Sequence, residues 1–482
     1  MSLTTSNLTS GFIDLATFDE IERYLYGTLE ATAYFVRETR KSTWFTQVPV
    51  ILSNSSGSAQ FNNDFSVSIS RAGDYLLHSW LRVTFPAIQL NPSYNSGGAS
   101  PVLRTNLTVR WTQNLMHNLI KECNITFNDL VAARFDNYHL DFWAAFTVPA
   151  SKQTGYNNMI GNTSNLNAPK NNGLTVVGGV ISPDLPSVTL NLPLPFFYSR
   201  DSGVALPTAA LPYNEMRINF SLRDWSELLI VEAVSGATTE QRVVPTVGSA
   251  LSNHLLAAPA LSNVQVWANY AIVSNDERKR MACAPRDILI EQVQTAPRQT
   301  FAPATNATPS FDIRFSHAIK ALFFAARNKT FAAEWSNYTA ASPQASGTDV
   351  FKTNTNKGAD PLSQVSLVYE NTARLSQMGA DYFSLVNPWY HAPSIPEVTG
   401  YHCYSYSLDF YNLDPMGSTN YGKLTNVSIR PEASNQALVS AGGSVSGFAN
   451  VNGFNQTYDF LVTVVNNNII RVSGGALGFP VL

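Results

Sequence analysis

LPLPFFYSRDSGVALPTAALPYNEMRINFSL, residues 192–222, is the segment that decides the fold class. It begins with two Leu-Pro pairs and a Phe-Phe-Tyr cluster, and a polar break separates these from its last part. That last part alternates polar residues with four apolar ones: Met216, Ile218, Phe220 and Leu222. Period-two alternation is typical of a strand with one buried face, and proline is confined to strand starts and sheet edges because it cannot donate to a ladder. The segment therefore predicts a strand start or sheet edge, followed by a regular strand.

The same alternation recurs along the chain. FSVSIS (65–70), CNITFN (123–128) and YSYSLDF (404–410) each place apolar side chains on one face. VQVWANYAIV (264–273) and YDFLVTVV (458–465) are more apolar and predict strands buried on both faces. Turns rich in Gly, Pro, Asn and Ser separate these runs. Many short strands joined by such loops are typical of sandwiches and barrels, so we expect an all-β fold with few short helices.

The chain has 482 residues, which is too many for one ordinary core, so two or more domains are expected. Charged residues make up only 13%, about half of the roughly 25% usual in globular proteins, and the net charge is -3. Nucleic-acid binding normally shows as a basic excess or stripe, so no direct contact with nucleic acid is expected. A surface this poor in charge suits close contacts with other copies, because interface cores are depleted in charge. An all-β protein with polar loops would have the same composition.

The three cysteines, Cys123, Cys283 and Cys403, are too few and too scattered for a disulfide framework. They fit a protein that folds in a reducing compartment. The N-terminal sequence lacks the basic region and continuous apolar run of a secretory signal. No run approaches the roughly 18 apolar residues of a membrane span.

Three segments have helical rather than alternating patterns. TFDEIERYLYG (17–27) combines a Thr17–Glu20 capping box with a terminal glycine. NYHLDFWAAF (137–146) follows a predicted strand, and RLSQMGADYFSLV (374–386) is a weaker candidate because it contains a glycine. We expect short helices at these three places.

The first of these helices is a candidate contact arm. Phe18, Ile21 and Leu25 share one face at helical spacing, and the leader before the helix is polar and expected to be mobile. A helix this short is unstable by itself and needs packing partners. We interpret it as an arm that packs its apolar face under a neighbouring protein or against a lipid surface. A helix lying on its own domain is the alternative.

Two stretches of the chain resemble each other and predict a duplicated β-domain. Each starts with a histidine, His117 or His317, and continues with a strand and an acidic or Asn turn (FND or YEN). A strand end with Arg134 or Arg374 follows, and then a helix that closes in an aromatic pair. Chance similarity between β-rich stretches is the alternative. The boundary between the copies is expected in the proline-marked stretch 223–262.

No catalytic or metal-binding constellation is recognisable in the sequence. It has neither a Gly-x-Ser-x-Gly elbow nor a phosphate-binding loop, and its seven histidines form no metal-ligand spacing. His402 and Cys403 are adjacent, so they would point to opposite faces of a strand. The charged run NDERKRMA (275–282) would contact an anionic partner or, as the commoner case, form a solvated element. No catalytic residue, cofactor or metal is therefore expected.

Six motifs, spread from the first predicted helix to the last residue, resemble the major capsid proteins of nucleocytoplasmic large DNA viruses. The iridovirus-like branch is the most similar. The motifs are, in chain order, SGFIDLATFDEIERYLYG, TAYFVRETRKSTWFTQVPV, SRAGDYLLHSWLRV, LPLPFFYSRDSGVALPTAALPYNEMRI, GSTNYGKLTNVSI and NNNIIRVSGGALGFPVL. The resemblance implies a structural virion protein and not an enzyme.

The fold that the resemblance implies is two consecutive eight-stranded jelly-roll β-barrels. Their expected bounds are 34–223 for the first roll and 262–482 for the second, with an N-terminal arm at 1–33 and a linker at 224–261. A jelly roll is a wedge of two sheets that leaves few open edges and gathers its loops at its ends. The internal similarity of the two halves would follow from this duplication.

The implied function is that of a major capsid protein, whose homotrimeric, pseudo-hexagonal capsomers tile the icosahedral shell of a large DNA virus. The implied partners are two further copies, neighbouring capsomers and minor capsid proteins under the shell, with the inner membrane as a further candidate for the arm. The chain would be made and assembled in the host cytoplasm and lie in the outer capsid of the virion. A soluble β-rich carbohydrate-binding protein or enzyme is the competing class, and it would need a ligand cleft instead of a symmetric assembly.

Within this fold the opening segment has a structural interpretation. Residues 200–213 would cross an end of the first barrel, and Leu206, Leu211 and Tyr213 would plug it. NEMRINFSL (214–222) would be the last strand of that barrel and would close its sheet before the linker.

Overall fold

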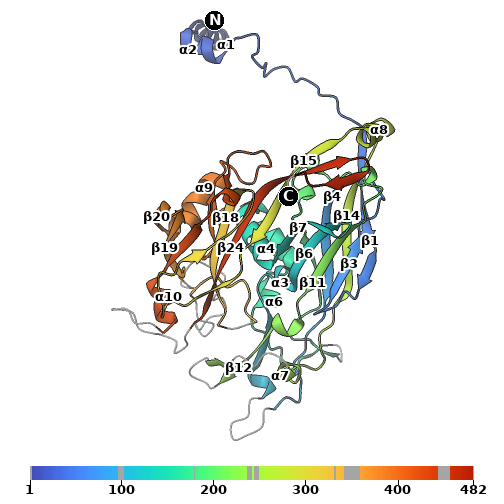
Figure 1. Cartoon of the computed structure of the whole chain (residues 1–482), viewed down its shortest axis with the longest axis vertical. Helices are drawn as coiled ribbons and strands as arrows, with labels where there is room; N and C mark the ends of the chain where they lie inside the picture. The colour runs from blue at the N-terminus through green and yellow to red at the C-terminus, as the bar shows by residue number, and fades with distance from the viewer. Residues whose placement is uncertain are drawn as a thin grey trace. The chain divides into compact units, whose positions relative to one another are not determined.

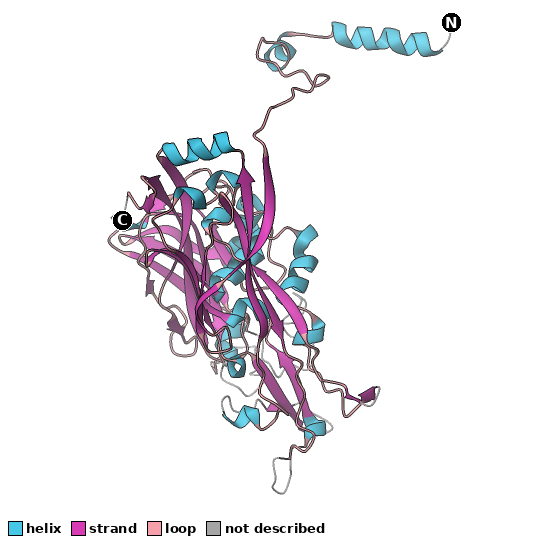
Figure 2. Ribbon diagram, turned by 90° about the vertical axis from the view of Figure 1, so that its right-hand side faces the viewer, coloured by secondary structure: helices cyan, strands magenta, loops and turns pink. Residues whose placement is uncertain are grey.

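The computed structural model describes residues 3–95, 103–177, 180–235, 241–243, 249–330, 333–340, 359–442 and 456–480. The chain divides into two units, Met1–Trp44 and Phe45–Leu482. In the larger unit the strands form the body, and short helices lie among them and beside them (Figure 2).

The N-terminal unit contains two helices, α1 (Leu3–Ala16) and α2 (Glu20–Leu25). α1 runs through the polar leader, which the sequence did not predict to be helical. The capping box of α2 also differs from the predicted one. Asp19 accepts from the Glu20 N–H at 2.8 Å, and Glu22 accepts from the Asp19 N–H at 3.3 Å. Thr17 instead follows the end of α1, and its hydroxyl donates to the Asp14 carbonyl at 2.6 Å.

The first part of the larger unit is built from two antiparallel sheets (Figure 1). One sheet has the strand order β1 (Phe45–Leu52), β14 (Ser262–Val273), β4 (Tyr75–Phe85), β10 (Val188–Pro193). The other has the order β2 (Asn54–Gly57), β3 (Asp64–Ser68), β11 (Met216–Leu222), β6 (Ile120–Phe127), β7 (Leu130–Asp136). Apart from the short edge strand β2, these orders are those of an eight-stranded jelly roll.

The interior of this first roll is formed by the faces that the alternation predicts to be buried. The prediction that 264–273 is buried on both faces is wrong, because Trp267 of β14 is only half-buried. All four alternating apolar residues of β11 are buried: Met216, Ile218, Phe220 and Leu222. Phe220 stacks on Phe65 of β3 with 4.9 Å between the ring centroids. Each such side chain contributes roughly 1.5–3 kcal/mol relative to an exposed one, so contacts of this kind hold the sheets face to face.

The position of β14 overturns the predicted boundary at residue 262. The prediction assigned this strand to the second roll, but β14 lies between β1 and β4 and pairs with both. Val266 has Leu52 beside it in β1 and Leu81 in β4, and all three side chains are buried. Without β14, both neighbouring strands would present unpaired edges inside the sheet. The predicted last strand, β11, lies instead between β3 and β6, and β14 closes the roll.

The predicted linker 224–261 contains regular structure. Its elements are the 3-10 turn η5 (Trp225–Glu227), β12 (Leu229–Ser235), β13 (Gln241–Val243) and α7 (Ser249–Ser252). β12 pairs with β5 (Leu107–Trp111), a strand from the connection that follows β4. In Figure 1, β12 and α7 lie below the larger sheets. This segment is therefore part of a small three-stranded sheet at one end of the roll.

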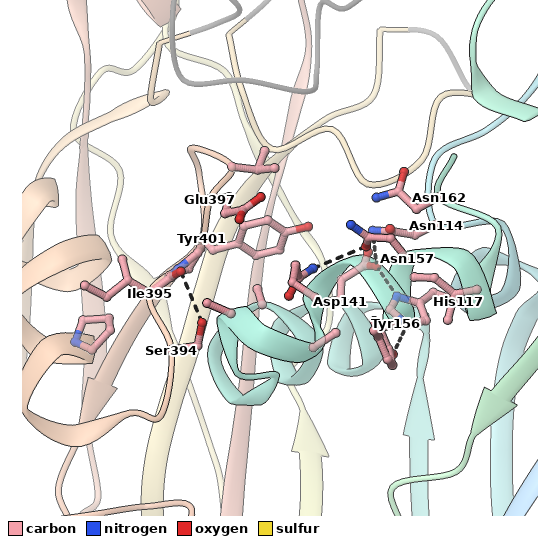
Figure 3. Close-up of a pocket in the computed structure, with 18 of the residues that line it drawn as sticks. Asn114, His117, Asp141, Tyr156, Asn157, Asn162, Ser394, Ile395, Glu397 and Tyr401 are labelled. Atoms are coloured by element: carbon pink, nitrogen blue, oxygen red, sulfur yellow. Dashed lines mark hydrogen bonds and ion pairs between the residues drawn. The ribbon is translucent and has the colours of Figure 1, made fainter. Parts of the chain in front are cut away.

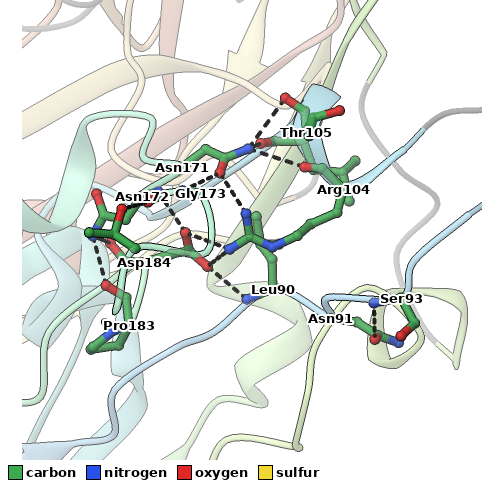
Figure 4. Close-up of polar contacts among 12 residues, drawn as sticks. Leu90, Asn91, Ser93, Arg104, Thr105, Asn171, Asn172, Gly173, Pro183 and Asp184 are labelled. Atoms are coloured by element: carbon green, nitrogen blue, oxygen red, sulfur yellow. Dashed lines mark hydrogen bonds and ion pairs between the residues drawn. The ribbon is translucent and has the colours of Figure 1, made fainter. Parts of the chain in front are cut away.

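A buried ion pair fixes the loops at this end (Figure 4). Arg104, in the 3-10 turn η1 (Arg104–Asn106), donates to both carboxylate oxygens of Asp184 at 3.2 and 3.1 Å. Asp184 also accepts the backbone N–H of Leu90 at 2.9 Å and that of Asn172 at 2.7 Å. These donors offset the desolvation of the buried carboxylate, so one side chain ties several connections together. Between Asn172 and Asp184 lies the hairpin of β8 (Val176–Val177) and β9 (Val180–Ile181).

The second part of the larger unit repeats the jelly-roll order. One sheet has the order β15 (Arg286–Thr295), β24 (Tyr458–Ser473), β18 (Ala318–Asn328), β21 (His402–Ser405). The other has the order β17 (Phe311–Asp312), β23 (Val427–Ala433), β19 (Leu362–Tyr369), β20 (Thr372–Gly379). Short strands extend the first of these sheets: β16 (Gln299–Phe301), β22 (Thr419–Asn420) and β25 (Ala476–Gly478). The predicted fold class, two consecutive eight-stranded jelly rolls, is confirmed.

Two of the three predicted helices lie in the rolls. The prediction for 137–146 is confirmed, and the prediction for 374–386 is wrong in its first part. α4 (Asn137–Thr147) confirms the helix predicted over 137–146. In the stretch 374–386, β20 runs to Gly379, and only then does the chain form the π-helix η6 (Tyr382–Val386) and α9 (Asn387–His391). Pairing of β20 with β19 overrides the local helical pattern.

Six further helical elements are short. They are α3 (Leu115–Leu119), α5 (Ala150–Ile160), α6 (Ser164–Asn167), α8 (Asn275–Cys283), α10 (Asn435–Ser440) and the 3-10 turn η7 (Tyr421–Lys423). α8 is the charged run predicted as a solvated element or an anion contact, and none of its residues is buried.

The predicted duplication holds for one pair of features and fails for another. Asn128–Asp129 joins β6 to β7, Glu370–Asn371 joins β19 to β20, and all four residues have φ between 47° and 65°. The FND and YEN turns are therefore equivalent hairpin turns. The histidines are not equivalent, because His117 lies in α3 before β6 whereas His317 precedes β18, the counterpart of β4.

The connection between β10 and β11 contains the 3-10 turns η2 (Phe197–Ser199), η3 (Ser202–Val204) and η4 (Thr208–Ala210). Leu206 and Leu211 are fully buried, and Leu206 pairs with the start of β4. Tyr213 is 76% exposed and lies against Gly475 of the second roll, so it is not part of the buried set predicted as a plug. Arg71 fixes the loop by donating to the carbonyl oxygen of Leu211 at 2.8 Å. The plugging role of Leu206 and Leu211 stays a prediction.

Replacing Leu211 with Asp tests that role. The substitution places a carboxylate at a fully buried apolar position, so we expect insoluble protein or a loss of about 4 kcal/mol or more in the free energy of unfolding. Urea unfolding followed by fluorescence measures this. Tyr213→Asp, nearby but exposed, is the matched control and should change the value by less than about 0.5 kcal/mol. Equal stability of the two variants would contradict the role of Leu211.

Candidate functional site: the junction of the two rolls and the faces beside it

Asp141 on α4 is the centre of a buried polar network where the two rolls meet (Figure 3). Its carboxylate accepts hydrogen bonds from four side chains: Asn114 (3.1 Å), His117 (2.9 Å), Ser336 (2.8 Å) and Tyr338 (2.8 Å). The first two belong to the first roll, and the last two to the second. A carboxylate taken out of water needs such partners, and here both rolls supply them.

His117 extends the network to α5, because its Nε2 lies 2.6 Å from the Tyr156 hydroxyl. Its Nδ1 faces the Asp141 carboxylate and must donate, so Nε2 accepts from Tyr156. Burial, reinforced by the charge of Asp141, raises the pKa of Tyr156 and that of Tyr338. The order carboxylate, imidazole, hydroxyl is that of a hydrolase triad, but a phenol with a raised pKa is a poor nucleophile. The network is suited to holding the rolls together.

A cavity of about 770 Å³ lies beside this network. Asp141, His117 and Tyr156 line it from the first roll, and the loop after α9, with Glu397 and Tyr401, lines it from the second (Figure 3). These three first-roll groups bond to one another, so the protein itself supplies their hydrogen-bond partners.

Next to the polar network, α4 packs aromatic side chains on the second roll. Phe142 and Phe146 both stack on Phe323 of β18, with ring centroids 5.8 and 5.5 Å apart. Phe142 also contacts Tyr338 and Tyr401, each at 5.9 Å. All five side chains are buried, and they belong to one apolar cluster that continues from the core of the first roll into the sheet of the second.

Charged side chains complete the junction. The Trp335 ring lies between the guanidinium of Arg223 from the first roll, at 3.7 Å, and that of Arg327, at 3.8 Å. Burial lowers the pKa of Arg223 to about 10, which leaves it charged at neutral pH, so both contacts are cation–π interactions. Glu291 of β15 pairs with Arg200 of the first roll at 2.6 Å. Removing one member of a buried pair leaves an uncompensated charge, so such pairs restrict how the rolls can be placed.

Two surfaces beside this junction carry exposed or half-buried apolar side chains. One is the outer face of β4 and β14, where the half-buried Trp80 and Trp267 stack with ring centroids 6.1 Å apart. The other is the outward side of η6 and α9, where four large side chains are exposed: Leu385, Val386, Trp389 and Tyr390. In Figure 1, β4 and β14 lie at the right of the larger unit and α9 at its left.

The predicted site residues fall in different environments. Phe18, Ile21 and Leu25 are exposed in the N-terminal unit. Leu206 and Leu211 belong to the buried core of the first roll, and Tyr213 lies on its surface. No sequence pattern predicted the network around Asp141. The signal that could have located it is a polar residue inside each of two apolar stretches: Asp141 in LDFWAAF and His117 in NLMHNLI.

Within the part of the chain that the structure describes, no three His, Cys, Asp or Glu side chains are grouped to hold a metal ion. None of the helices described is long and apolar enough to cross a membrane. All three cysteines are free thiols, and burial raises the pKa of Cys123 and Cys403 well above the ordinary value.

Solved double jelly-roll capsid proteins have a similar architecture. The structure of PBCV-1 VP54 matches with a TM-score of 0.68 at 19% identity, over 93% of this chain and 100% of that one. The Faustovirus major capsid protein matches with a TM-score of 0.65 at 12% identity, over 95% of this chain and 96% of that one. At these identities the likeness establishes the fold, which is the double jelly roll.

The sequence establishes the family. Residues 33–273 match a model described as the major capsid protein N-terminus, and residues 277–478 match one described as the large eukaryotic DNA virus major capsid protein. The chain is 62% identical to the major capsid protein of Costelytra zealandica iridescent virus and 51% identical to that of Lymphocystis disease virus 1, over 100% of the chains in both cases. The chain therefore belongs to the major capsid protein family of large eukaryotic DNA viruses.

Family membership confirms the predicted resemblance and the prediction of a structural virion protein rather than an enzyme. The competing prediction, a carbohydrate-binding protein or enzyme, is not supported. The first family match ends at residue 273, which is also the last residue of β14, in agreement with the place of this strand in the first roll.

Replacing Asp141 with Ala should weaken the junction. The variant leaves buried donors of both rolls without their shared acceptor, so we expect the free energy of unfolding to fall by about 3 kcal/mol or more. Tyr338→Phe removes one donor and leaves the carboxylate its other partners, so the expected loss is about 1 kcal/mol. Hydrogen exchange of the α4 and β18 amides should increase more in the first variant. Equal effects would contradict the central place of Asp141.

Proposed function

We propose that three copies of this chain form a ring-shaped, pseudo-hexagonal capsomer, and that such capsomers tile the icosahedral shell of a virion. The support comes from the junction inside one chain. There α4, the helix after the β6–β7 hairpin, covers the β15-β24-β18-β21 sheet of the second roll. The corresponding helix of the second roll, η6–α9, and the corresponding sheet of the first roll, β1-β14-β4-β10, carry the two surfaces described above.

A chain with a free helix at one side and a free sheet face at the other is suited to join its copies head to tail. Such a heterologous contact closes into a ring when the rotation per chain permits it. If the contact between chains repeats the contact within a chain, three chains place six similar rolls around one axis. A ring with six similar walls packs into a layer with six neighbours. The charged fraction of only 13% fits walls that are buried between copies.

Minor capsid proteins under the shell and neighbouring capsomers are then the further partners, and the outer capsid of the virion is the place of the protein. The free thiols fit synthesis and assembly in the host cytoplasm, because disulfides are rare in reducing compartments. A net charge of -3 gives the chain no general attraction to nucleic acid, so no direct contact with the genome is proposed.

For the N-terminal arm, residues 1–33, we propose a protein partner under the shell rather than the inner membrane. Phe18, Ile21 and Leu25 are exposed and need an apolar surface to cover them. The arm contains five acidic side chains and one basic side chain. Anionic lipid surfaces attract basic segments and repel acidic ones. A basic protein groove with an apolar floor complements the arm in both respects.

The molar mass in solution tests the capsomer proposal. Multi-angle light scattering of the purified, folded chain should give three times the chain mass of 52.8 kDa, because each uncovered face finds its partner on another copy. The value should stay constant over a wide range of concentrations. A single species of 52.8 kDa would contradict the proposal.

A double variant, Ile21→Asp with Leu25→Asp, tests the arm. Both positions are exposed, so the variant should fold and form the same oligomer as the wild type, while its incorporation into virions should fall at least about tenfold. Thr28→Asp with Thr32→Asp adds the same charge at exposed polar positions and should leave incorporation unchanged. The wild type should not float with anionic vesicles. Vesicle binding that the Ile21/Leu25 variant loses would instead identify the membrane as the partner.

A further inference from the structure

We infer that the η6–α9 helix of one copy docks on the Trp80–Trp267 face of the next copy, with Trp389 as the central side chain of the contact. This inference rests on the proposed trimer and names the contact that would close it. The two rolls of one chain match at the receiving strands, β4 and β18, and at the docking helices, α4 and η6–α9.

The receiving strands match in length and in their irregularity. β4 and β18 each contain 11 residues, and each pairs with the last strand of its own roll. The register of that pairing skips Leu77 in β4 and Lys320 in β18, and the two skipped residues hold the same place in their strands. Aligned by this bulge, Trp80 occupies the position of Phe323.

The docking helices match as well. Leu385 follows the end of β20 by the same number of residues as Phe142 follows the end of β7, and Trp389 and Phe146 lie one helical turn further on. Within the chain, Phe142 and Phe146 stack on Phe323. Their counterparts Leu385 and Trp389 are 52% and 71% exposed. The docking helix of the second roll therefore has no sheet to pack on within the chain. The corresponding sheet of the first roll has no helix to cover it.

The receiving face has the shape to accept a large aromatic side chain. Trp80 and Trp267 stack with an angle of 6° between their planes and are both half-buried, so two parallel indole rings lie side by side on this face. A hollow of about 1090 Å³ lies beside Trp80 and is lined also by Trp143, Met159 and Pro193. Tryptophan and tyrosine side chains that fill such hollows commonly dominate the binding free energy of an interface. Trp389 and the neighbouring Tyr390 are exposed side chains of this kind.

The charges of the two sides are complementary. Arg82 of β4 occupies the position that Ala325 has in β18, so the receiving face is more polar than its counterpart inside the chain. This suits a surface that is in contact with water until assembly. Arg82 and Lys152 are exposed on the receiving side, and Asp381 and Glu397 are exposed on the side of the docking helix. Opposite charges at the rim favour this orientation over a contact between identical faces.

Photo-crosslinking locates the contact without removing the aromatic ring. Trp389 is replaced with p-benzoylphenylalanine in the full chain, and a mixture of isotope-labelled and unlabelled copies is irradiated and digested. We expect mixed-isotope adducts between residue 389 and peptides from β4 or β14. The same photoreactive residue at Leu256, an exposed position of the first roll, is the matched control and should give no such adduct.

A substitution tests the energetic part of the inference. Trp389→Ala should raise the concentration at which half of the trimer dissociates at least about tenfold, with an unchanged circular dichroism spectrum, because the side chain is exposed in the single chain. Leu256→Ala should leave that concentration unchanged.

The outcomes separate this inference from the capsomer proposal. A wild-type trimer whose adducts map elsewhere, together with an unaffected Trp389→Ala trimer, would overturn the docking contact and leave the capsomer in place. A monomeric wild type would overturn the capsomer proposal itself, and the docking contact with it.

Discussion

The packing of α4 on the β15-β24-β18-β21 sheet is the contact on which the rest of the structure depends. Phe142 and Phe146 stack on Phe323, and the buried carboxylate of Asp141 beside them needs the donors that both rolls supply. Polar and apolar parts therefore reinforce each other, because the aromatic contact strengthens the hydrogen bonds and the hydrogen bonds fix the helix. The two rolls share one continuous core instead of being joined only by the chain.

This contact has a direction, since a helix of one roll meets a sheet of the other. Each roll carries one such helix and one such sheet. Within a chain, the helix of the first roll meets the sheet of the second. The helix of the second roll and the sheet of the first roll remain uncovered. The exposed Trp389 belongs to the uncovered helix, and the half-buried Trp80 belongs to the uncovered sheet. If the uncovered helix of one copy packs on the uncovered sheet of the next, both are covered by the kind of contact that already exists within a chain. The low charge of the chain fits such contacts. The assembly proposed for the capsomer thus follows from the same physics as the fold of one chain.

The sequence predicted where the strands lie more accurately than it predicted which strands pair with each other. Alternation located β11 and its buried face, but it does not specify which strand lies alongside, so β14 was assigned to the wrong roll. The helical pattern over 374–386 failed up to Gly379 because pairing with β19 outweighs local propensity. Tyr213 was predicted to plug the barrel together with Leu206 and Leu211, yet it lies on the surface. The network around Asp141 joins residues from three separate parts of the chain, and only the fold brings them together.

An electron-microscopy map of the assembled protein, at a resolution that traces individual strands, is the most direct measurement of this account. It should show six rolls around one axis, with the junction between copies superimposable on the junction within a copy and η6–α9 buried against β4 and β14. A map in which copies meet through other surfaces, or in which Trp389 faces solvent in the assembly, would contradict it.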